Sequence, residues 1–96
     1  MSARLVVLVS GNGSNLQAIL NACADKTLPA TVVAVISNKP DAYGLTRAKN
    51  AGLDAIYFPK ANGETRRDYD SRLADYVTSR QPNYIVLAGW MHEPPQ

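Results

Sequence analysis

The chain has 96 residues, of which 46% are hydrophobic and 19% are charged, and its net charge is +2. This length fits one domain, and this composition is typical of a soluble globular chain rather than a disordered one. The ten Lys and Arg residues are scattered, and the closest cluster is Arg66-Arg67, which is too small for a nucleic-acid-binding surface. We therefore expect neither DNA nor RNA as a partner.

Cys23 is the only cysteine, so no disulfide forms within the chain and a reducing compartment is favoured. Its place in an apolar helical pattern predicts a buried small hydrophobic side chain rather than a reactive thiol. The apolar run Leu5–Val9 near the N-terminus is too short for a signal peptide or a membrane span. We expect a cytoplasmic protein with no membrane partner.

Apolar runs alternate with amphipathic stretches along the chain. In chain order, the pattern first predicts a strand over Leu5–Val9, and then a helix that ends near Lys26 and turns Leu16, Ile19, Leu20 and Cys23 inward. Next come a strand over Thr31–Ser37, a helix from about Tyr43 to Ala51 that is capped by Gly52, and a strand over Ala55–Phe58. The last two elements are a helix that turns Tyr69, Leu73, Tyr76 and Val77 inward and a strand over Tyr84–Ala88. The strand over Leu5–Val9 lacks polar alternation, which indicates burial on both of its faces.

Strands and helices that alternate in this way predict an α/β fold with a parallel sheet covered by helices on both faces. Right-handed crossovers favour a Rossmann-like strand order of 3-2-1-4. Ligands of such sheets bind beyond the C-terminal ends of the strands, where the strand order reverses. This topology places the turn Gly11–Asn15 beside the segment Gly89–Met91.

The fourth strand forms an edge in this order, although Ile85, Val86 and Leu87 are apolar on both faces. No Lys or bulge protects that edge, and the eight residues that follow include two prolines, which cannot donate to a strand ladder. The sheet is therefore predicted to be truncated after its fourth strand.

The turn GNGSN, from Gly11 to Asn15, predicts an anion-binding site. Gly11 and Gly13 can adopt backbone angles that other residues avoid, and without side chains they let an oxygen approach the main-chain N–H groups. The dipole and unpaired N–H groups of the following helix favour a negative charge. A tight turn with a Ser or Asn cap and no ligand is the alternative reading.

Three comparisons narrow the anion to a monophosphate. A dinucleotide fingerprint requires a third glycine, but that position is Leu16, and Ser37-Asn38-Lys39 offers no carboxylate for a ribose. A Walker A loop is absent from the sequence. Lys39 is read as a solvated surface lysine rather than as a ligand of the phosphate.

Four segments, VVLVSGNGSNLQAIL, VVAVISNKPDAYGLTRAKNAG, RRDYDSRL and YIVLAGWM, resemble in order the first half of the phosphoribosylglycinamide formyltransferases. The resemblance covers residues 4–91. It implies transfer of a formyl group from 10-formyltetrahydrofolate to glycinamide ribonucleotide in purine biosynthesis, and it implies no metal.

The resemblance also implies roles for individual residues. Gly13, Ser14 and Asn15 would hold the substrate phosphate, while Gly11 and Asn12 would shape the loop. Met91 matches the start of the segment that lines the folate pterin pocket. Arg66 matches a family arginine on the folate side, with Arg67 as an alternative.

The resemblance ends after Met91. It therefore implies that residues 1–91 are the N-terminal, phosphate-binding part of a formyltransferase domain and that residues 92–96 are a divergent tail. The family continues to an Asn-x-His-Pro motif and a later aspartate, which carry the catalysis, and none of these is present in HEPPQ. His92 and Glu93 are expected to be exposed tail residues without a catalytic role. We therefore expect the chain to be inactive alone; the alternative is a non-catalytic ribose-phosphate-binding module that forms a homodimer or pairs with another chain through its open edge.

Overall fold

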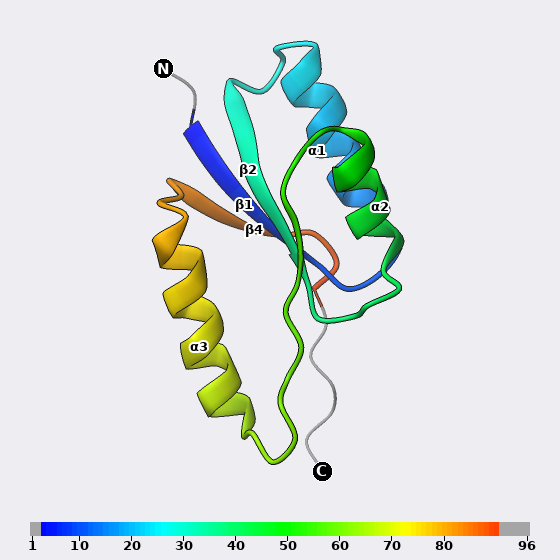
Figure 1. Cartoon of the computed structure of the whole chain (residues 1–96). Coiled ribbons are helices and arrows are strands. Elements are labelled where there is room, and N and C mark those ends of the chain that lie inside the picture. Colours follow the sequence, from blue (N-terminus) through cyan, green and yellow to red (C-terminus); the bar gives the residue numbers. More distant parts are fainter. Residues whose placement is uncertain (1–2, 91–96) are drawn as a thin grey trace.

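The computed structural model describes residues 3–90 and contains one four-stranded sheet with three helices (Figure 1). The elements are β1 (Ala3–Val9), α1 (Ser14–Ala24), β2 (Ala30–Ser37), α2 (Tyr43–Asn50), β3 (Ala55–Tyr57), α3 (Arg66–Ser79) and β4 (Tyr84–Leu87). All strand pairs are parallel, and the strand order is β3-β2-β1-β4. The predicted α/β fold and strand order are confirmed.

The sheet separates two apolar clusters. Helices α1 and α2 lie on one face and α3 lies on the other (Figure 1). On the first face, Leu16 of α1 and Leu45 of α2 pack with Val7 and Val9 of β1. On the second face, Tyr69, Leu73 and Val77 of α3 pack with alternate residues of β1 and β2. Strands with apolar side chains on both faces are stabilised only when both faces are covered.

Helix α1 ends at Ala24, near the predicted end at Lys26, which adopts a left-handed conformation with φ 64° that no helix continues. Other predictions need correction. Strand β3 ends at Tyr57 and strand β4 ends at Leu87, each one residue before the predicted end. Cys23 is half-buried rather than fully buried: it packs against the first cluster, and partial burial raises the pKa of its thiol. Gly52, with φ 76°, follows α2 as predicted.

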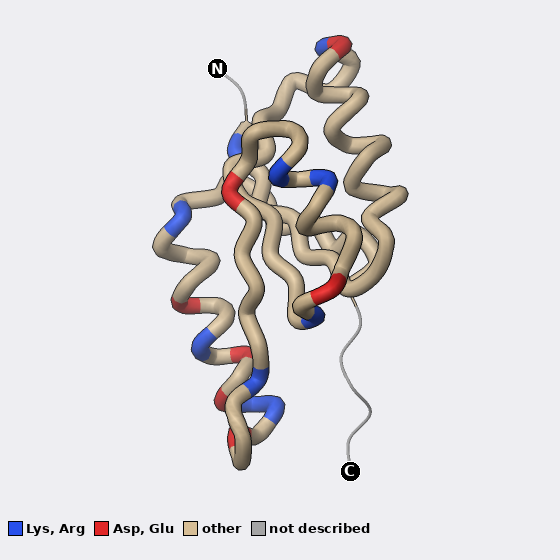
Figure 2. The backbone as a smooth tube through the Cα atoms, turned by 45° about the vertical axis from the view of Figure 1, so that its right-hand side comes forward, with Lys and Arg blue, Asp and Glu red and all other residues tan. Residues whose placement is uncertain are grey.

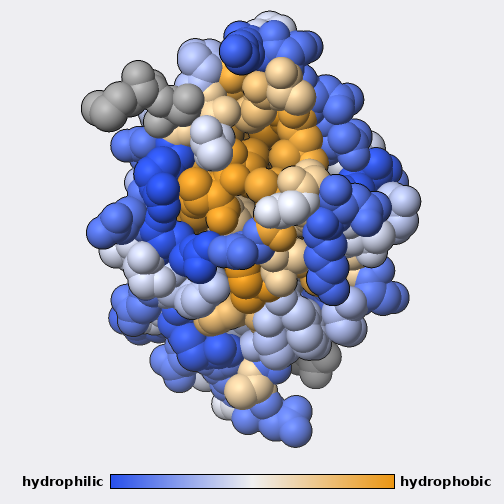
Figure 3. Space-filling model, turned by 45° about the horizontal axis from the view of Figure 1, so that its top comes forward, coloured by the Kyte–Doolittle hydropathy of each residue, from blue (hydrophilic) through white to orange (hydrophobic). Residues whose placement is uncertain are grey.

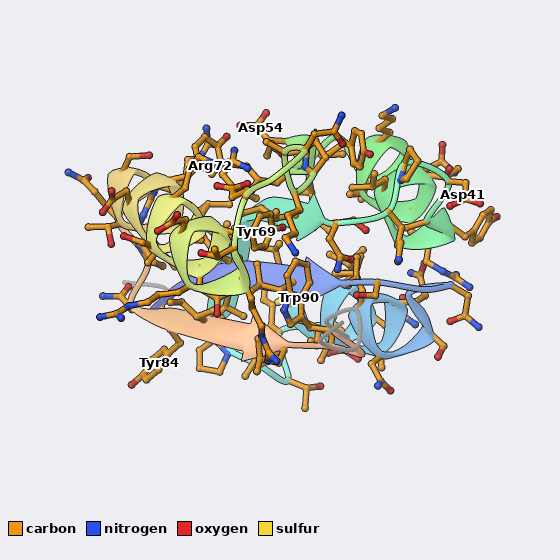
Figure 4. The ribbon with its side chains drawn as sticks, turned by 90° about the horizontal axis from the view of Figure 1, so that it is seen from below. Asp41, Asp54, Tyr69, Arg72, Tyr84 and Trp90 are labelled. Carbon is orange, nitrogen blue, oxygen red and sulfur yellow. The ribbon has the colours of Figure 1, made fainter. Side chains whose placement is uncertain are left out.

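Strand β4 is largely exposed, as expected for an unprotected edge. Within residues 3–90 it pairs only with β1. Tyr84 and Leu87 are each 65% exposed and Ile85 is 55% exposed, and Tyr84 points away from the sheet (Figure 4). One face of the molecule also shows apolar residues gathered in a hollow with a hydrophilic rim (Figure 3). The structure thus leaves a large amount of apolar surface open.

Charged residues are interspersed along the chain rather than gathered by sign (Figure 2), as the sequence predicted. Among residues 3–90, no helix has the length and apolar character needed to cross a membrane.

Candidate phosphate site and its family

A small hollow lies at the C-terminal ends of β1 and β4. It is lined by Gly11, Asn12, Gly13, Ser14, Asn15, Ala88 and Gly89. The Ser10 N–H donates to the Gly89 carbonyl at 3.2 Å, which joins the two segments that form the hollow. The hollow has a volume of about 100 Å³, which suits a single anionic group and is far below the roughly 300–1,000 Å³ typical of a site for a whole nucleotide-sized ligand.

The N-terminus of α1 opens into this hollow. Gly13 is the N-cap, with φ 78° and no side-chain cap, and the first turn carries no acidic residue. Gln17 is the first helical residue whose N–H bonds a backbone carbonyl, that of Gly13, at 2.8 Å. In the described part of the chain, the N–H groups of Asn15 and Leu16 have no hydrogen-bond acceptor. Unpaired donors at a helix N-terminus favour an anion.

Asn12 satisfies one donor of the first turn. Its side-chain Oδ1 accepts from the Ser14 N–H at 2.9 Å. The side chains of Ser14 and Asn15 are exposed and do not cap the helix. The alternative reading of a turn capped by Ser or Asn is therefore met only in part, since one amide is occupied and others stay open.

The two glycines of the loop are not equivalent. Gly13 requires the left-handed backbone that glycine favours, with φ 78°, whereas Gly11 does not have a positive φ. The expectation that both glycines supply unusual backbone angles is therefore wrong for Gly11. A Cβ atom at Gly11 would meet no atom within 4 Å, so what Gly11 supplies is open space on the wall of the hollow.

Polar side chains join the ends of β1 and β2 next to the loop. Ser10 Oγ donates to Asn38 Oδ1 at 2.9 Å, and the backbone N–H of Lys39 donates to Ser37 Oγ at 3.1 Å. Lys39 is half-buried rather than a fully solvated surface lysine. It is not among the residues that line the hollow.

The residues expected on the folate side lie elsewhere. Arg66 is exposed in the first turn of α3, with its Nε 4.0 Å from Asp70 Oδ2. Arg67 is exposed beside it. Met91, His92 and Glu93 lie outside the described residues. Neither arginine lines the hollow at β1, so their predicted role stays a prediction.

The segment before Arg66 is tied to α3 by a compact polar cluster. Arg72 of α3 donates to both carboxylate oxygens of Glu64, at 3.0 and 2.8 Å, and to the Pro59 carbonyl at 2.7 Å. The hydrogen bond from Arg72 lowers the pKa of Glu64 to about 2. Tyr69, which lies next to Arg72 (Figure 4), donates to the Phe58 carbonyl at 2.6 Å, and burial raises its pKa to about 12.

One contributor to the site lies in the segment that the predicted topology placed beside the turn, and two others were not predicted from the sequence. Gly89, with φ 80°, lines the hollow. Gly44 and Arg47 of α2 hold the loop from its other side: the Gly44 N–H donates to the Gly11 carbonyl at 3.2 Å, and Arg47 Nε donates to the Asn12 carbonyl at 2.7 Å. Within residues 3–90, no group of three or more His, Cys, Asp or Glu side chains could hold a metal ion.

The sequence matches the family model described as formyl transferase over residues 3–93. The chain belongs to the formyl transferase family. The matched residues include the GNGSN turn. The match confirms the resemblance predicted from the sequence.

Relatives of this formyl transferase chain include the phosphoribosylglycinamide formyltransferase of Escherichia coli, 46% identical over 87 residues, and that of Haemophilus influenzae, 44% identical over 88 residues. The alignments cover 91% and 92% of this chain but only 41% and 42% of those proteins. The chain thus spans less than half the length of the curated relatives it matches.

Solved structures agree with the sequence comparison. Glycinamide ribonucleotide transformylase 1 from Symbiobacterium toebii superimposes with a TM-score of 0.90 at 42% identity, over 95% of this chain and 43% of that one. The phosphoribosylglycinamide formyltransferase from Coxiella burnetii gives a TM-score of 0.88 at 42% identity, over 99% of this chain and 44% of that one.

Proposed function

We propose that this chain is the substrate-phosphate-binding part of an enzyme that transfers a formyl group from 10-formyltetrahydrofolate to glycinamide ribonucleotide. The observation that carries the proposal is the hollow at the N-terminus of α1, where backbone N–H groups stay open among residues 3–90. The names of the relatives support the substrate, since a phosphoribosyl group carries one phosphate.

In this reaction the amine of glycinamide ribonucleotide attacks the formyl carbon of the folate. The C–N bond to the new amide forms, the bond from the formyl carbon to N10 of the folate breaks, and the amine proton passes to the tetrahydrofolate product. Residues Gly11–Asn15 do not touch these atoms. Their part is to hold the phosphate, which fixes one end of the substrate and lowers the entropy cost of bringing the reacting atoms together.

Folate binding is proposed for Arg66 and Met91, with Arg67 as the alternative to Arg66. An exposed guanidinium in the first turn of α3 can pair with a carboxylate of a folate tail. We propose that the activity is cytoplasmic and that the formyl-transfer step requires residues outside this sequence, which contains no Asn-x-His-Pro motif.

The test combines binding with catalysis. Isothermal titration calorimetry of the 96-residue chain should detect binding of glycinamide ribonucleotide. Binding of the nucleoside that lacks the phosphate should be much weaker. A formyl-transfer assay with both substrates should give no product. Equal affinity for the two ligands contradicts the phosphate role, and product formation by the purified chain contradicts the proposed need for further residues.

A second candidate function rests on the exposed β4. A strand with Ile85 and Leu87 more than half exposed is a template for pairing with another chain, so the chain could act as a non-catalytic module that dimerises. Sedimentation velocity distinguishes the two: a dimer that Leu87→Lys converts to a monomer supports this function, and a monomer at all concentrations contradicts it.

A further inference from the structure

Helix α2 approaches the GNGSN loop more closely than side chains would allow. A Cβ atom on Gly13 would lie 2.7 Å from the Gly44 Cα, and a Cβ atom on Gly44 would lie 2.8 Å from Val9 Cγ2. Both distances are shorter than van der Waals contact, so this packing requires glycine at both positions. The approach brings the first turn of α2 within hydrogen-bonding distance of the loop.

Two consecutive carbonyls of the loop point toward α2. The Gly11 carbonyl accepts from the Gly44 N–H at 3.2 Å, and the Asn12 carbonyl accepts from Arg47 Nε at 2.7 Å. The Gly44 N–H is one of the donors that a helix N-terminus leaves unpaired. The guanidinium supplies a charge-assisted hydrogen bond, which is stronger than one between neutral groups.

This arrangement fixes the direction of two amides. In a trans peptide, C=O and N–H point in opposite directions, and the described chain has no cis peptide. Because α2 holds the carbonyls of Gly11 and Asn12, the N–H groups of Asn12 and Gly13 point away from α2. Helix α2 packs over β2 and β3, whereas Ala88 and Gly89 close the hollow from the β4 side. These amides therefore face the hollow.

Arg47 is itself held in place. Its second nitrogen donates to Gln17 Oε1 at 3.2 Å, and its guanidinium carbon lies 4.8 Å from the centre of the Tyr43 ring. The side chain is half-buried. Three separate contacts on one planar group fix its orientation, so Arg47 differs from a solvated surface arginine.

We propose that Arg47 is a positioning residue for the phosphate site: by holding the Asn12 carbonyl, it aims the amides of the GNGSN loop at the phosphate. The inference rests on the proposed phosphate-binding function. Lys49, on the same helix, is exposed and provides a matched control, because Lys49→Met removes an equal charge from α2 without touching the loop.

The experiment measures binding of ribose 5-phosphate and of inorganic phosphate to the 96-residue chain by calorimetry, and follows the amide resonances of Asn12 and Gly13 by NMR. Arg47→Met should weaken binding by about tenfold, the effect of losing one charge-assisted hydrogen bond, and should shift both resonances without ligand. Lys49→Met should bind as the unchanged chain does. Arg47→Lys keeps the charge but cannot hold Asn12 and Gln17 together. Its affinity for phosphate should therefore lie between that of Arg47→Met and that of the unchanged chain.

The outcomes separate this inference from the function on which it rests. If the unchanged chain binds neither phosphate, the proposed function fails. If it binds and Arg47→Met binds equally well, only the role of Arg47 is overturned. Equal weakening by Arg47→Met and Lys49→Met indicates a general charge effect and also overturns the role. Should Arg47→Met lack a cooperative melting transition, Arg47→Lys decides, since unchanged affinity there contradicts the need for the guanidinium.

Discussion

Gly13 and Gly44 touch each other across the loop and α2, with the position of a Cβ atom on Gly13 only 2.7 Å from the Gly44 Cα. The contact joins the turn after β1 to the second helix of the fold. It allows the backbone hydrogen bond between Gly44 and Gly11. The conformation of the GNGSN loop thus depends on α2, whose Gly44 lies 31 residues after Gly13 in the chain.

Gly13→Ala is expected to destabilise the fold. The new methyl group would collide with the backbone of α2, and alanine disfavours φ 78°. Left-handed strain and overpacking together predict a loss of about 2–4 kcal/mol in the free energy of unfolding. Urea denaturation followed by circular dichroism measures this loss. An unchanged urea midpoint would show that α2 can move away from the loop without a loss of stability.

Gly11→Ala is expected to act on binding instead. A Cβ atom there meets no neighbour within 4 Å, and Gly11 does not need a positive φ, so the free energy of unfolding should change by about 0.5 kcal/mol or less. The methyl group would enter the wall of the hollow and reduce phosphate affinity. Calorimetry with ribose 5-phosphate checks this, and undiminished affinity would place the phosphate away from Gly11.

Tyr69 should make stability fall at alkaline pH. Burial raises the pKa of this phenol to about 12, above the value of about 10 in an unfolded chain. A raised pKa means that the neutral phenol stabilises the fold fully below pH 10 and that this contribution is lost as the pH rises toward 12. Tyr69→Phe lacks the hydrogen bond to Phe58, so it should be less stable at neutral pH and lose less between pH 10 and 12. The measurement is the free energy of unfolding as a function of pH, and an equal loss between pH 10 and 12 in Tyr69→Phe and the unchanged chain would contradict this account.

Glu64 should act at the opposite end of the pH range. Its pKa is lowered to about 2, first by the hydrogen bond from Arg72 and then by the Ala61 N–H, so its contribution is present above about pH 4.5 and is lost as the pH falls toward 2. Glu64→Gln should loosen the segment around Lys60 at neutral pH and raise its rate of cleavage by trypsin. A cleavage rate equal to that of the unchanged chain would show that Arg72 and Pro59 hold the segment without the carboxylate.

Much of the fold follows from local pattern. The apolar runs LVVLV and TVVAVIS predict their strands because neither has a polar face to expose, and the order of elements then predicts the parallel sheet. The turn GNGSN likewise predicts the hollow that it lines. The sequence does not reveal that Lys26 adopts a left-handed conformation, because only the geometry of the turn from α1 to β2 requires it.

The contacts that α2 makes with the GNGSN loop could not be predicted, for a different reason. Gly44 and Arg47 lie on α2, more than 30 positions from Gly11 and Asn12, and no periodicity links them. A glycine in the first turn of a helix was the available signal, because glycine weakens a helix unless close packing requires it. Contacts of this kind depend on tertiary packing.

The most direct test of the account is an NMR titration of the 96-residue chain with glycinamide ribonucleotide, observing the backbone amides. The account predicts that the largest shifts fall on Gly11–Asn15 and on Gly89, and that the nucleoside without its phosphate does not produce them. Shifts that spare this loop, or that are the same without the phosphate, would contradict the assignment of GNGSN as the phosphate site.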